Sequence, residues 1–228
     1  MTHIVKRKKL KVYVIGAGIY GSGYTRFLDN FEYSRIEDAD LVILTGGADV
    51  DPSLYGARKH PTTFSQISRD KEELEELKKV RPDQLVYGAC RGSQFSCVVN
   101  GGLLVQNVSN HAVGRGHAIT STKAAKKYSS IGQEIYEITS THHQMQYPFN
   151  LPTSDYDILF TSFPNRSDFY EGDKIDPTPI LEIGEPEIVL YHKEGCPRFL
   201  AVQGHPEMIP NSEVSKMIED LIYELLEE

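Results

Sequence analysis

The sequence is poor in cysteine and has no long apolar run. Its 228 residues include only three cysteines, Cys90, Cys97 and Cys196, which are too few for a disulfide framework and are not spaced as zinc ligands. A reducing, cytoplasmic compartment is therefore the expected location. No apolar run approaches the roughly 18 residues that a membrane-spanning helix needs. The N-terminus is basic but lacks the apolar stretch of a signal peptide, so we expect no association with a membrane.

The chain also lacks an excess of positive charge. Its formal net charge of −8 argues against a general nucleic-acid or anionic-membrane surface, so neither partner is expected. Hydrophobic residues make up 39% of the sequence and charged residues 25%, a balance that allows a sizeable core and disfavours disorder. Because the chain has no internal repeat and no Pro/Gly linker, residues 1–228 are predicted to form a single domain.

The most informative stretch combines a short apolar run with the pattern Gly-x-Cys-x-Gly at residues 85–92. The following segment, Ser93–Asn100, is predicted to be a short helix that ends at Gly101-Gly102. A strand, a tight turn and a helix in this order form a nucleophile elbow, here with cysteine in place of serine. The turn would present Cys90 at a helix N-terminus, where unpaired N–H groups and the helix dipole favour the thiolate. From this short pattern alone, a buried cysteine in a glycine-rich turn is an equally good interpretation.

Apolar runs along the chain predict a mostly parallel sheet. The continuous run Leu41–Leu44 is typical of a central parallel strand, and Leu10–Ile15 is the predicted first strand. A helix is predicted from Ser68 as its N-cap, with its charges on a solvated face, and an amphipathic helix is predicted from Ser212. The expected architecture is a three-layer α/β/α fold. Further strands are expected at residues 103–105, 116–121, 134–139, 158–160, 188–191 and 199–203, the second and third of them antiparallel.

A catalytic cysteine needs a base, and the base needs a group that orients it. His205 and Glu207 are the candidates, because they follow a buried strand near the C-terminus. Pro206 disfavours the α region for His205 and keeps the segment extended, so the side chains of residues 205 and 207 point the same way. Strand ends in a parallel sheet share one edge, so Cys90, His205 and Glu207 are predicted to meet there.

Backbone amides are the expected electrophilic groups. In an elbow, the N–H of the residue after the nucleophile, here Arg91, points at the developing oxyanion. The second donor is expected from Gly46-Gly47, in a loop at the carboxyl end of a neighbouring strand. An ordinary turn is the alternative interpretation of this glycine pair.

Two weaker patterns have simpler explanations. The spacing of Gly16, Gly18 and Gly21 after a strand, before an expected helix over Tyr24–Phe31, matches a dinucleotide-binding fingerprint. The acidic residue that should follow a second strand is not clearly placed, so an ordinary glycine-rich turn is favoured. The adjacent pair His142-His143 has no Cys, Asp or Glu at a supporting spacing, so no metal and no other cofactor is expected.

The elbow and the C-terminal pair carry a family resemblance. Gly88-Ala-Cys90-Arg-Gly-Ser-Gln94, together with Gly204-His205-Pro206-Glu207, resembles the class I glutamine amidotransferase superfamily. Other stretches resemble its γ-glutamyl hydrolase branch (peptidase C26), which includes γ-glutamyl-γ-aminobutyrate hydrolases. These stretches are residues 46–52 with Tyr55, Arg69-Asp70 with Glu73, residues 101–106 and residues 140–144.

The resemblance implies a flavodoxin-like sheet and a catalytic triad of Cys90, His205 and Glu207. It also implies an oxyanion hole built from the amides of Gly47 and Arg91. The residues implied to line the substrate site are Gly46, Gln94, Ser140, His142, His143 and Gln144. The chain is rather short for the hydrolase branch, and residues 55–68 and 150–179 are the segments that depart from it.

The expected function is cleavage of the γ-amide bond of glutamine or of a γ-glutamyl amide, through a γ-glutamyl thioester on Cys90. Two roles are compatible with this chemistry: a free-standing hydrolase, or a glutaminase that supplies ammonia to a separate synthetase. An alternative from another class is a catalytically silent α/β module that binds a nucleotide at the turn formed by residues 16–21.

Overall fold

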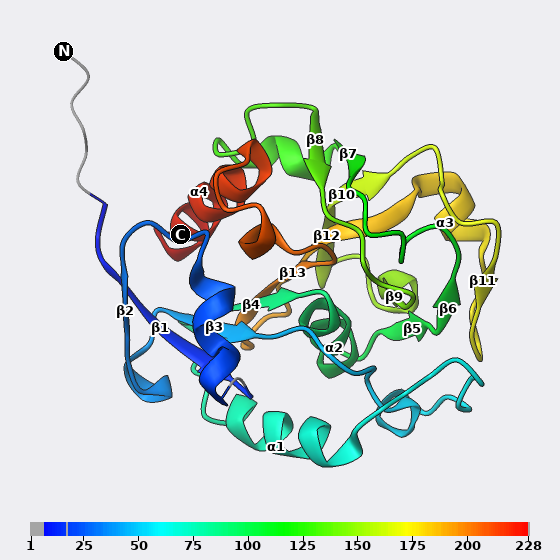
Figure 1. Ribbon diagram of the computed structural model, residues 1–228, viewed down its shortest axis with the longest axis horizontal. Coiled ribbons are helices and arrows are strands. Elements are labelled where there is room, and N and C mark those ends of the chain that lie inside the picture. Colours follow the sequence, from blue (N-terminus) through cyan, green and yellow to red (C-terminus); the bar gives the residue numbers. More distant parts are fainter. Residues whose placement is uncertain (1–6, 17, 228) are drawn as a thin grey trace.

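Helices cover both faces of one mixed sheet, which gives three layers in the computed structural model of residues 7–16 and 18–227 (Figure 1). The predicted three-layer α/β fold is therefore confirmed. In spatial order the sheet contains β2 (Phe31–Tyr33), β1 (Leu10–Ile15), β3 (Leu41–Leu44), β4 (Leu85–Ala89), β13 (Arg198–Val202), β12 (Glu185–Tyr191), β10 (Tyr156–Ser162), β7 (His117–Ser121) and β8 (Ile135–Ile138).

The sheet has a parallel half and an antiparallel half. The strands from β2 to β13 pair in parallel, whereas those from β13 to β8 pair antiparallel. The antiparallel pairing of β7 with β8 was predicted from the sequence. Two small ladders lie outside the main sheet: β5 (Leu103–Val105) with β9 (Met145–Tyr147), and β6 (Asn107–Val108) with β11 (Tyr170–Glu171).

Helices cover both faces of the sheet. Alternate residues of each strand face opposite sides, so Val42 and Leu44 pack in the core beneath α1 (Ile67–Leu77) and α2 (Arg91–Val99). Leu41 and Ile43 pack on the other side, against α4 (Glu213–Glu227). Figure 1 shows α1 and α4 on opposite sides of the sheet. The remaining short elements are α3 (Thr178–Ile183) and the 3₁₀ helices η1 (Gly18–Thr25), η2 (Ile36–Asp38), η3 (Pro52–Tyr55), η4 (Ala124–Lys127), η5 (Pro148–Asn150) and η6 (Pro206–Met208).

Two helix predictions need correction. The expected helix over Tyr24–Phe31 is wrong, because η1 ends at Thr25 and Phe31 begins β2, where it pairs with Leu10 of β1. The intervening Asp29-Asn30 is a typical turn sequence. Ser68 is not the N-cap of α1, because Gln66 holds that position and its carbonyl accepts a hydrogen bond from the Asp70 amide at 3.2 Å. In the described residues, no helix is long and apolar enough to cross a membrane.

Buried ion pairs join α1 to the start of α2. The side chain of Arg91 is buried and forms salt bridges with Asp70 and Glu73, which are also buried. Arg69 pairs with Glu73 as well, with 2.8 Å between Nε and Oε1. The expectation that the charges of this helix lie on a solvated face is therefore wrong for Asp70 and Glu73, because the buried guanidinium of Arg91 requires partners inside the fold.

Removing one partner of Arg91 should destabilise the fold. Asp70→Asn keeps the shape of the side chain but leaves the buried guanidinium only partly compensated, so we expect a loss of roughly 3 kcal/mol in the free energy of unfolding. The matched control is Asp83→Asn, which breaks a largely exposed pair with Arg81 and should cost less than about 1 kcal/mol. Urea unfolding of the three proteins measures both losses, and equal losses would contradict a structural role for the buried network.

Candidate active site

Cys90 lies in a strained turn between β4 and α2. Its backbone angles are φ 53° and ψ −110°, a left-handed conformation that non-glycine residues rarely adopt. Hydrogen bonds on both sides hold the turn: the Cys90 amide donates to the carbonyl of Val202 at 2.9 Å, and the Cys90 carbonyl accepts from the Gln94 amide at 3.3 Å. The thiol is partly exposed and sits at the N-terminus of α2, as expected for a nucleophile elbow.

The two glycines that flank Cys90 have steric reasons to be glycine. A Cβ on Gly88 would overlap the backbone of Gly92, and a Cβ on Gly92 would overlap the carbonyl oxygen of Leu44 on β3. The turn can pack against itself and against β3 only if residues 88 and 92 have no side chain. This explains the spacing Gly-x-Cys-x-Gly in physical terms.

His205 and Glu207 reach the same edge of the sheet from β13. Ala89 of β4 pairs with Val202 of β13, so the residues that follow these two strands emerge side by side. The Nδ1 atom of His205 lies 2.6 Å from Oε1 of Glu207, and the imidazole lies close enough to the Cys90 thiol for the two groups to interact. The structure thus brings the three predicted triad residues together, although the segment from residue 206 forms the 3₁₀ helix η6 and not the extended chain expected.

The surroundings of His205 favour its protonated form. Burial by itself disfavours a charged imidazole, but the hydrogen bonds with Cys90 and Glu207 outweigh it and raise the pKa of His205 to about 10. An imidazolium beside a thiol stabilises the thiolate, which is the reactive form of cysteine. The amide of His205 is fixed as well, because it donates to Oγ1 of Thr139 at 2.6 Å.

The glycine loop after β3 faces the same site. A Cβ on Gly46 would lie 2.9 Å from the Tyr24 hydroxyl, 3.1 Å from Cε1 of His205 and 3.7 Å from Cβ of Cys90, so a side chain here would crowd the imidazole. Arg69 holds the loop: its Nη2 donates to the Gly46 carbonyl at 3.0 Å and to Oγ1 of Thr45 at 2.9 Å. Gly47 adopts φ 135°, which glycine accepts readily.

The other expected oxyanion donor, the Arg91 amide, belongs to α2. Arg91 is the first residue of this helix, and the first amides of a helix have no partner within it. Its side chain points away into the ion pairs with α1, so the backbone amide is the part of Arg91 next to the thiol. The loop at residues 46–47 and the start of α2 therefore flank Cys90 from two elements.

The predicted substrate residues lie partly inside the protein. Ser140, His142 and Gln144 are buried, and the Gln94 side chain donates to the Gln144 carbonyl at 2.9 Å. Burial lowers the pKa of His142 well below its usual value, so this imidazole is neutral. The side chain of His143 is partly exposed, and its Nε2 lies 3.0 Å from Oδ1 of Asp49. This hydrogen bond raises the pKa of His143.

Sequence reasoning missed several residues around the thiol. Tyr24 of η1 lies beside the site, with its ring centroid 6.5 Å from that of His205 and its hydroxyl beside Gly46. Thr139 and Arg69 support His205 and the glycine loop, as described above. The positions of these residues in the sequence form no pattern that would connect them with Cys90. Only Arg69 belongs to a stretch that resembles the γ-glutamyl hydrolase branch.

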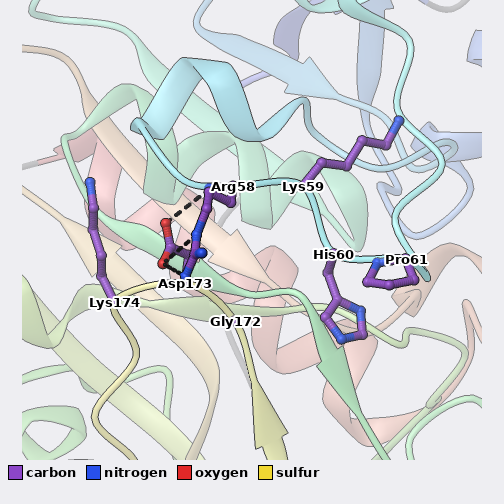
Figure 2. Close-up of a pocket in the computed structure, with 7 residues that line it drawn as sticks. All are labelled: Arg58, Lys59, His60, Pro61, Gly172, Asp173 and Lys174. Atoms are coloured by element: carbon purple, nitrogen blue, oxygen red, sulfur yellow. Dashed lines mark hydrogen bonds and ion pairs between the residues drawn. The ribbon is translucent and has the colours of Figure 1, made fainter.

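A cavity of about 570 Å³ lies outside this constellation (Figure 2). It is lined by residues 58–61 and 172–174, none of which was predicted to belong to the site. Figure 2 shows Arg58 bonded to Asp173, with 3.2 Å between Nη2 and Oδ1. The reactive edge of the sheet, and not this cavity, is therefore the candidate active site.

A known protein family and several known proteins match part of this sequence. The family model described as Peptidase C26 matches residues 30–148, which include the elbow and the loop at 140–144 but end before His205. The glutamine amidotransferase-like protein YvdE of Lactococcus lactis is 34% identical over 119 residues, which cover 46% of this chain and 50% of that protein. A protein described as glutamine amidotransferase Rv2859c, of Mycobacterium tuberculosis, is 31% identical over 48% of this chain and 39% of its own length. The chain thus spans half or less of the length of these curated relatives.

Solved structures with similar folds cover nearly the whole chain. A protein from Thermoplasma acidophilum, described as one of the subunits of a GMP synthase, has a TM-score of 0.61 at 15% identity and covers 97% of this chain and 96% of its own. A glutamine amidotransferase from Thermotoga maritima has a TM-score of 0.57 at 16% identity, over 97% of this chain and all of its own. At these identities, the likeness establishes the fold alone.

Replacing Gly92 should disrupt the elbow. We expect Gly92→Ala to lower the free energy of unfolding by about 2 kcal/mol or more, because the new methyl group must displace the backbone of β3. Gly132→Ala is the control, since no atom lies within 4 Å of the added Cβ, and its effect should stay within about 0.5 kcal/mol. Thermal and urea unfolding measure both, and a neutral Gly92→Ala would contradict the steric explanation.

Alkylation should distinguish the three cysteines. Since His205 keeps its proton up to about pH 10, we expect iodoacetamide to modify Cys90 faster than the exposed Cys196 at about pH 6, where ordinary thiols are protonated. The advantage should shrink as the pH rises through about 8.5, where ordinary thiols also become thiolates. Burial raises the pKa of Cys97 to about 12, so Cys97 should remain unmodified.

Glu207→Gln is the matched variant for this measurement, because it removes the negative charge that supports the imidazolium while preserving side-chain size. Peptide mass spectrometry after short exposures reads all three sites in one sample. Faster labelling of Cys97 or Cys196 than of Cys90 at about pH 6 would show that the thiol is not activated.

Proposed function

The chain belongs to the peptidase C26 family, and on that basis we propose that it is a cysteine hydrolase that cleaves the γ-amide bond of glutamine or of a γ-glutamyl amide. The observation that carries the proposal is the contact between the Cys90 thiol and an imidazole that Glu207 holds at 2.6 Å. A nucleophile, a base and an orienting carboxylate in hydrogen-bond reach of one another are what acyl transfer requires.

The proposed reaction starts with the Cys90 thiolate, which attacks the γ-carbonyl carbon of the substrate. The carbonyl oxygen becomes an oxyanion and accepts hydrogen bonds from the amides of Gly47 and Arg91. As this intermediate collapses, the C–N bond breaks and His205 gives its proton to the leaving ammonia or amine. The product of this half-reaction is a γ-glutamyl thioester on Cys90.

The second half-reaction releases the acid. His205, now neutral, takes a proton from a water molecule, and the hydroxide attacks the thioester carbonyl. The C–S bond breaks, glutamate leaves, and the proton on His205 restores the imidazolium beside the thiolate. Glu207 keeps the Nε2 atom of His205 directed at the sulfur through its hydrogen bond to Nδ1, so one imidazole serves both steps.

The free-standing γ-glutamyl hydrolase is the favoured role, because the matched family model is that of a peptidase family. The partly exposed His143 and the buried Asp49, which lies two residues after Gly47, are candidates to contact the glutamyl α-amino and α-carboxylate groups. The competing role is that of a glutaminase which passes ammonia to a separate synthetase. It draws support from the relatives described as glutamine amidotransferase-like and from a fold neighbour described as part of a synthase.

The nucleotide-binding alternative has less support. A dinucleotide fingerprint needs an α-helix N-terminus for the pyrophosphate, whereas the described residues after the turn form the 3₁₀ helix η1. The carboxylate of Glu73 lies against Gly16, where a phosphate would have to approach.

The function is tested with the purified chain and a panel of substrates that includes glutamine and γ-glutamyl-γ-aminobutyrate. We expect glutamate release, a loss of kcat of roughly 10³-fold or more in Cys90→Ala, and a loss of about 10²-fold in Glu207→Gln. Cys196→Ser is the control and should retain wild-type turnover. Strong activity on γ-glutamyl amides with none on glutamine would exclude the ammonia-donor role, and full activity in Cys90→Ala would exclude the mechanism.

A further inference from the structure

The antiparallel half of the sheet contains a cluster of ionisable side chains that the proposed reaction does not use. His111 precedes β7, His117 begins it, and Glu187 lies on β12. All three side chains are buried, with 0%, 4% and 0% of their surface exposed. One nitrogen from each imidazole and one carboxylate oxygen lie within 4.8 Å of one another. Three potential ligands therefore converge on one buried point.

The hydrogen bonds around the two imidazoles fix which nitrogen faces Glu187. Nδ1 of His117 lies 3.1 Å from the carbonyl oxygen of Ala118, so this nitrogen carries the proton and donates it. Its Nε2 is therefore the nitrogen that faces Oε1 of Glu187, at 3.2 Å. The Nδ1 atom of His117 has its hydrogen-bond partner in the backbone, and its Nε2 atom is the one available as a metal ligand.

His111 is arranged in the same way. Its Nε2 lies 3.1 Å from Oε2 of Glu185, so Nδ1 is the nitrogen left to face Glu187. Nδ1 faces Oε1 of Glu187 at 3.6 Å. The nearby Ser140 hydroxyl cannot supply a proton to it, because that hydroxyl donates to the backbone carbonyl of His111 at 2.6 Å.

Glu187 is left without hydrogen bonds. Neither of its carboxylate oxygens has a partner of acceptable geometry among the described residues, and neither does Nε2 of His117. A buried carboxylate is strongly unfavourable without positive charge beside it, and a cation held between Glu187 and the two imidazole nitrogens supplies that charge. The cluster has the composition and the polarity of a cation site.

We propose that His111, His117 and Glu187 bind one divalent transition-metal ion, with Zn²⁺ as the preferred ion. Two imidazole nitrogens and one carboxylate oxygen form a ligand set that suits Zn²⁺. Glu185 and the Ala118 carbonyl are the outer partners that metal-binding histidines usually have. Since the ligand atoms of only these three residues converge among those that the structure describes, the fourth position is left to water.

The proposed ion is structural and not catalytic. It joins β7 and the loop before it to β12, so it links segments about 70 residues apart in the chain. The carbonyl of Glu187 accepts a hydrogen bond at 2.8 Å from the amide of Gln203, two residues before His205. The ion therefore stiffens the part of the sheet from which His205 emerges, and through Ser140 and His142 it also supports the loop at 140–144.

Metal content tests the proposal directly. The chain is produced without an affinity tag, incubated with Zn²⁺, desalted and analysed by mass spectrometry of the metal. We expect about one Zn²⁺ per chain, and a rise in Tm of about 5 °C or more in Zn²⁺ relative to chelator. Substitution by Co²⁺ should give the visible absorption bands of a four-coordinate site. None of these measurements depends on hydrolysis, so this proposal and the proposed function fail separately.

Variants locate the ion. Glu187→Gln and His117→Gln should each lower Zn²⁺ affinity by roughly 10-fold or more. The matched control is His192→Gln, at a partly exposed histidine outside the cluster, and it should bind like the wild type. Cys90→Ala should also bind normally, which separates the cluster from the catalytic thiol. If a cluster variant does not fold, the Co²⁺ spectrum and the Zn²⁺ content of the wild type decide the outcome.

Two results would overturn the proposal. The first is a folded wild-type chain that retains less than about a tenth of an equivalent of Zn²⁺ and melts at the same temperature with and without chelator. In that case, protons shared between histidine and glutamate stabilise the cluster. The second is undiminished Zn²⁺ binding in both cluster variants together with its loss in Cys90→Ala, which would assign the ion to the active site.

Discussion

The candidate active site depends on the parallel pairing of β4 with β13. This register places the ends of two strands, more than 100 residues apart in the chain, next to each other. The hydrogen bond from the Cys90 amide to the Val202 carbonyl extends the pairing one residue past the strand and supports the strained conformation of the cysteine. His205 then needs only three further residues to reach the thiol. A shift of this register would separate sulfur from imidazole whatever else the fold preserved.

A network of buried ion pairs also supports the elbow. The guanidinium of Arg91 is buried between Asp70 and Glu73, and the same Glu73 binds Arg69, which in turn holds the carbonyl of Gly46. One chain of charges on α1 therefore connects the start of α2 to the glycine loop. The two amides proposed to bind the oxyanion belong to these two segments. The positions of these amides therefore depend on charged residues that do not themselves contact the substrate.

The antiparallel half of the sheet contributes differently. β12 is buried along its whole length, yet its first half carries Glu185 and Glu187 where its second half carries apolar residues. These carboxylates meet histidines from segments that also border the loop at 140–144. The polar groups of a buried cluster need hydrogen-bond or charge partners inside the protein, and the proposed cation is the partner in this cluster. The same cluster lies next to β13, the strand that precedes His205. Disorder in the cluster would therefore also disturb the candidate active site.

The sequence by itself determined the elements that follow from local patterns. The strands at residues 10–15 and 41–44, the short helix after Cys90 and the last helix all follow from apolar periodicity and from glycine, which alone fits the sharp turn. The local sequence also predicts that His205 and Glu207 follow a buried strand. Only the tertiary structure decided what depends on contacts between distant segments. It buried Asp70 and Glu73, set Tyr24 beside His205, turned Ser140 and His142 inward, and gathered His111, His117 and Glu187 at one point, because side-chain surroundings are made by packing and not by neighbours in the chain.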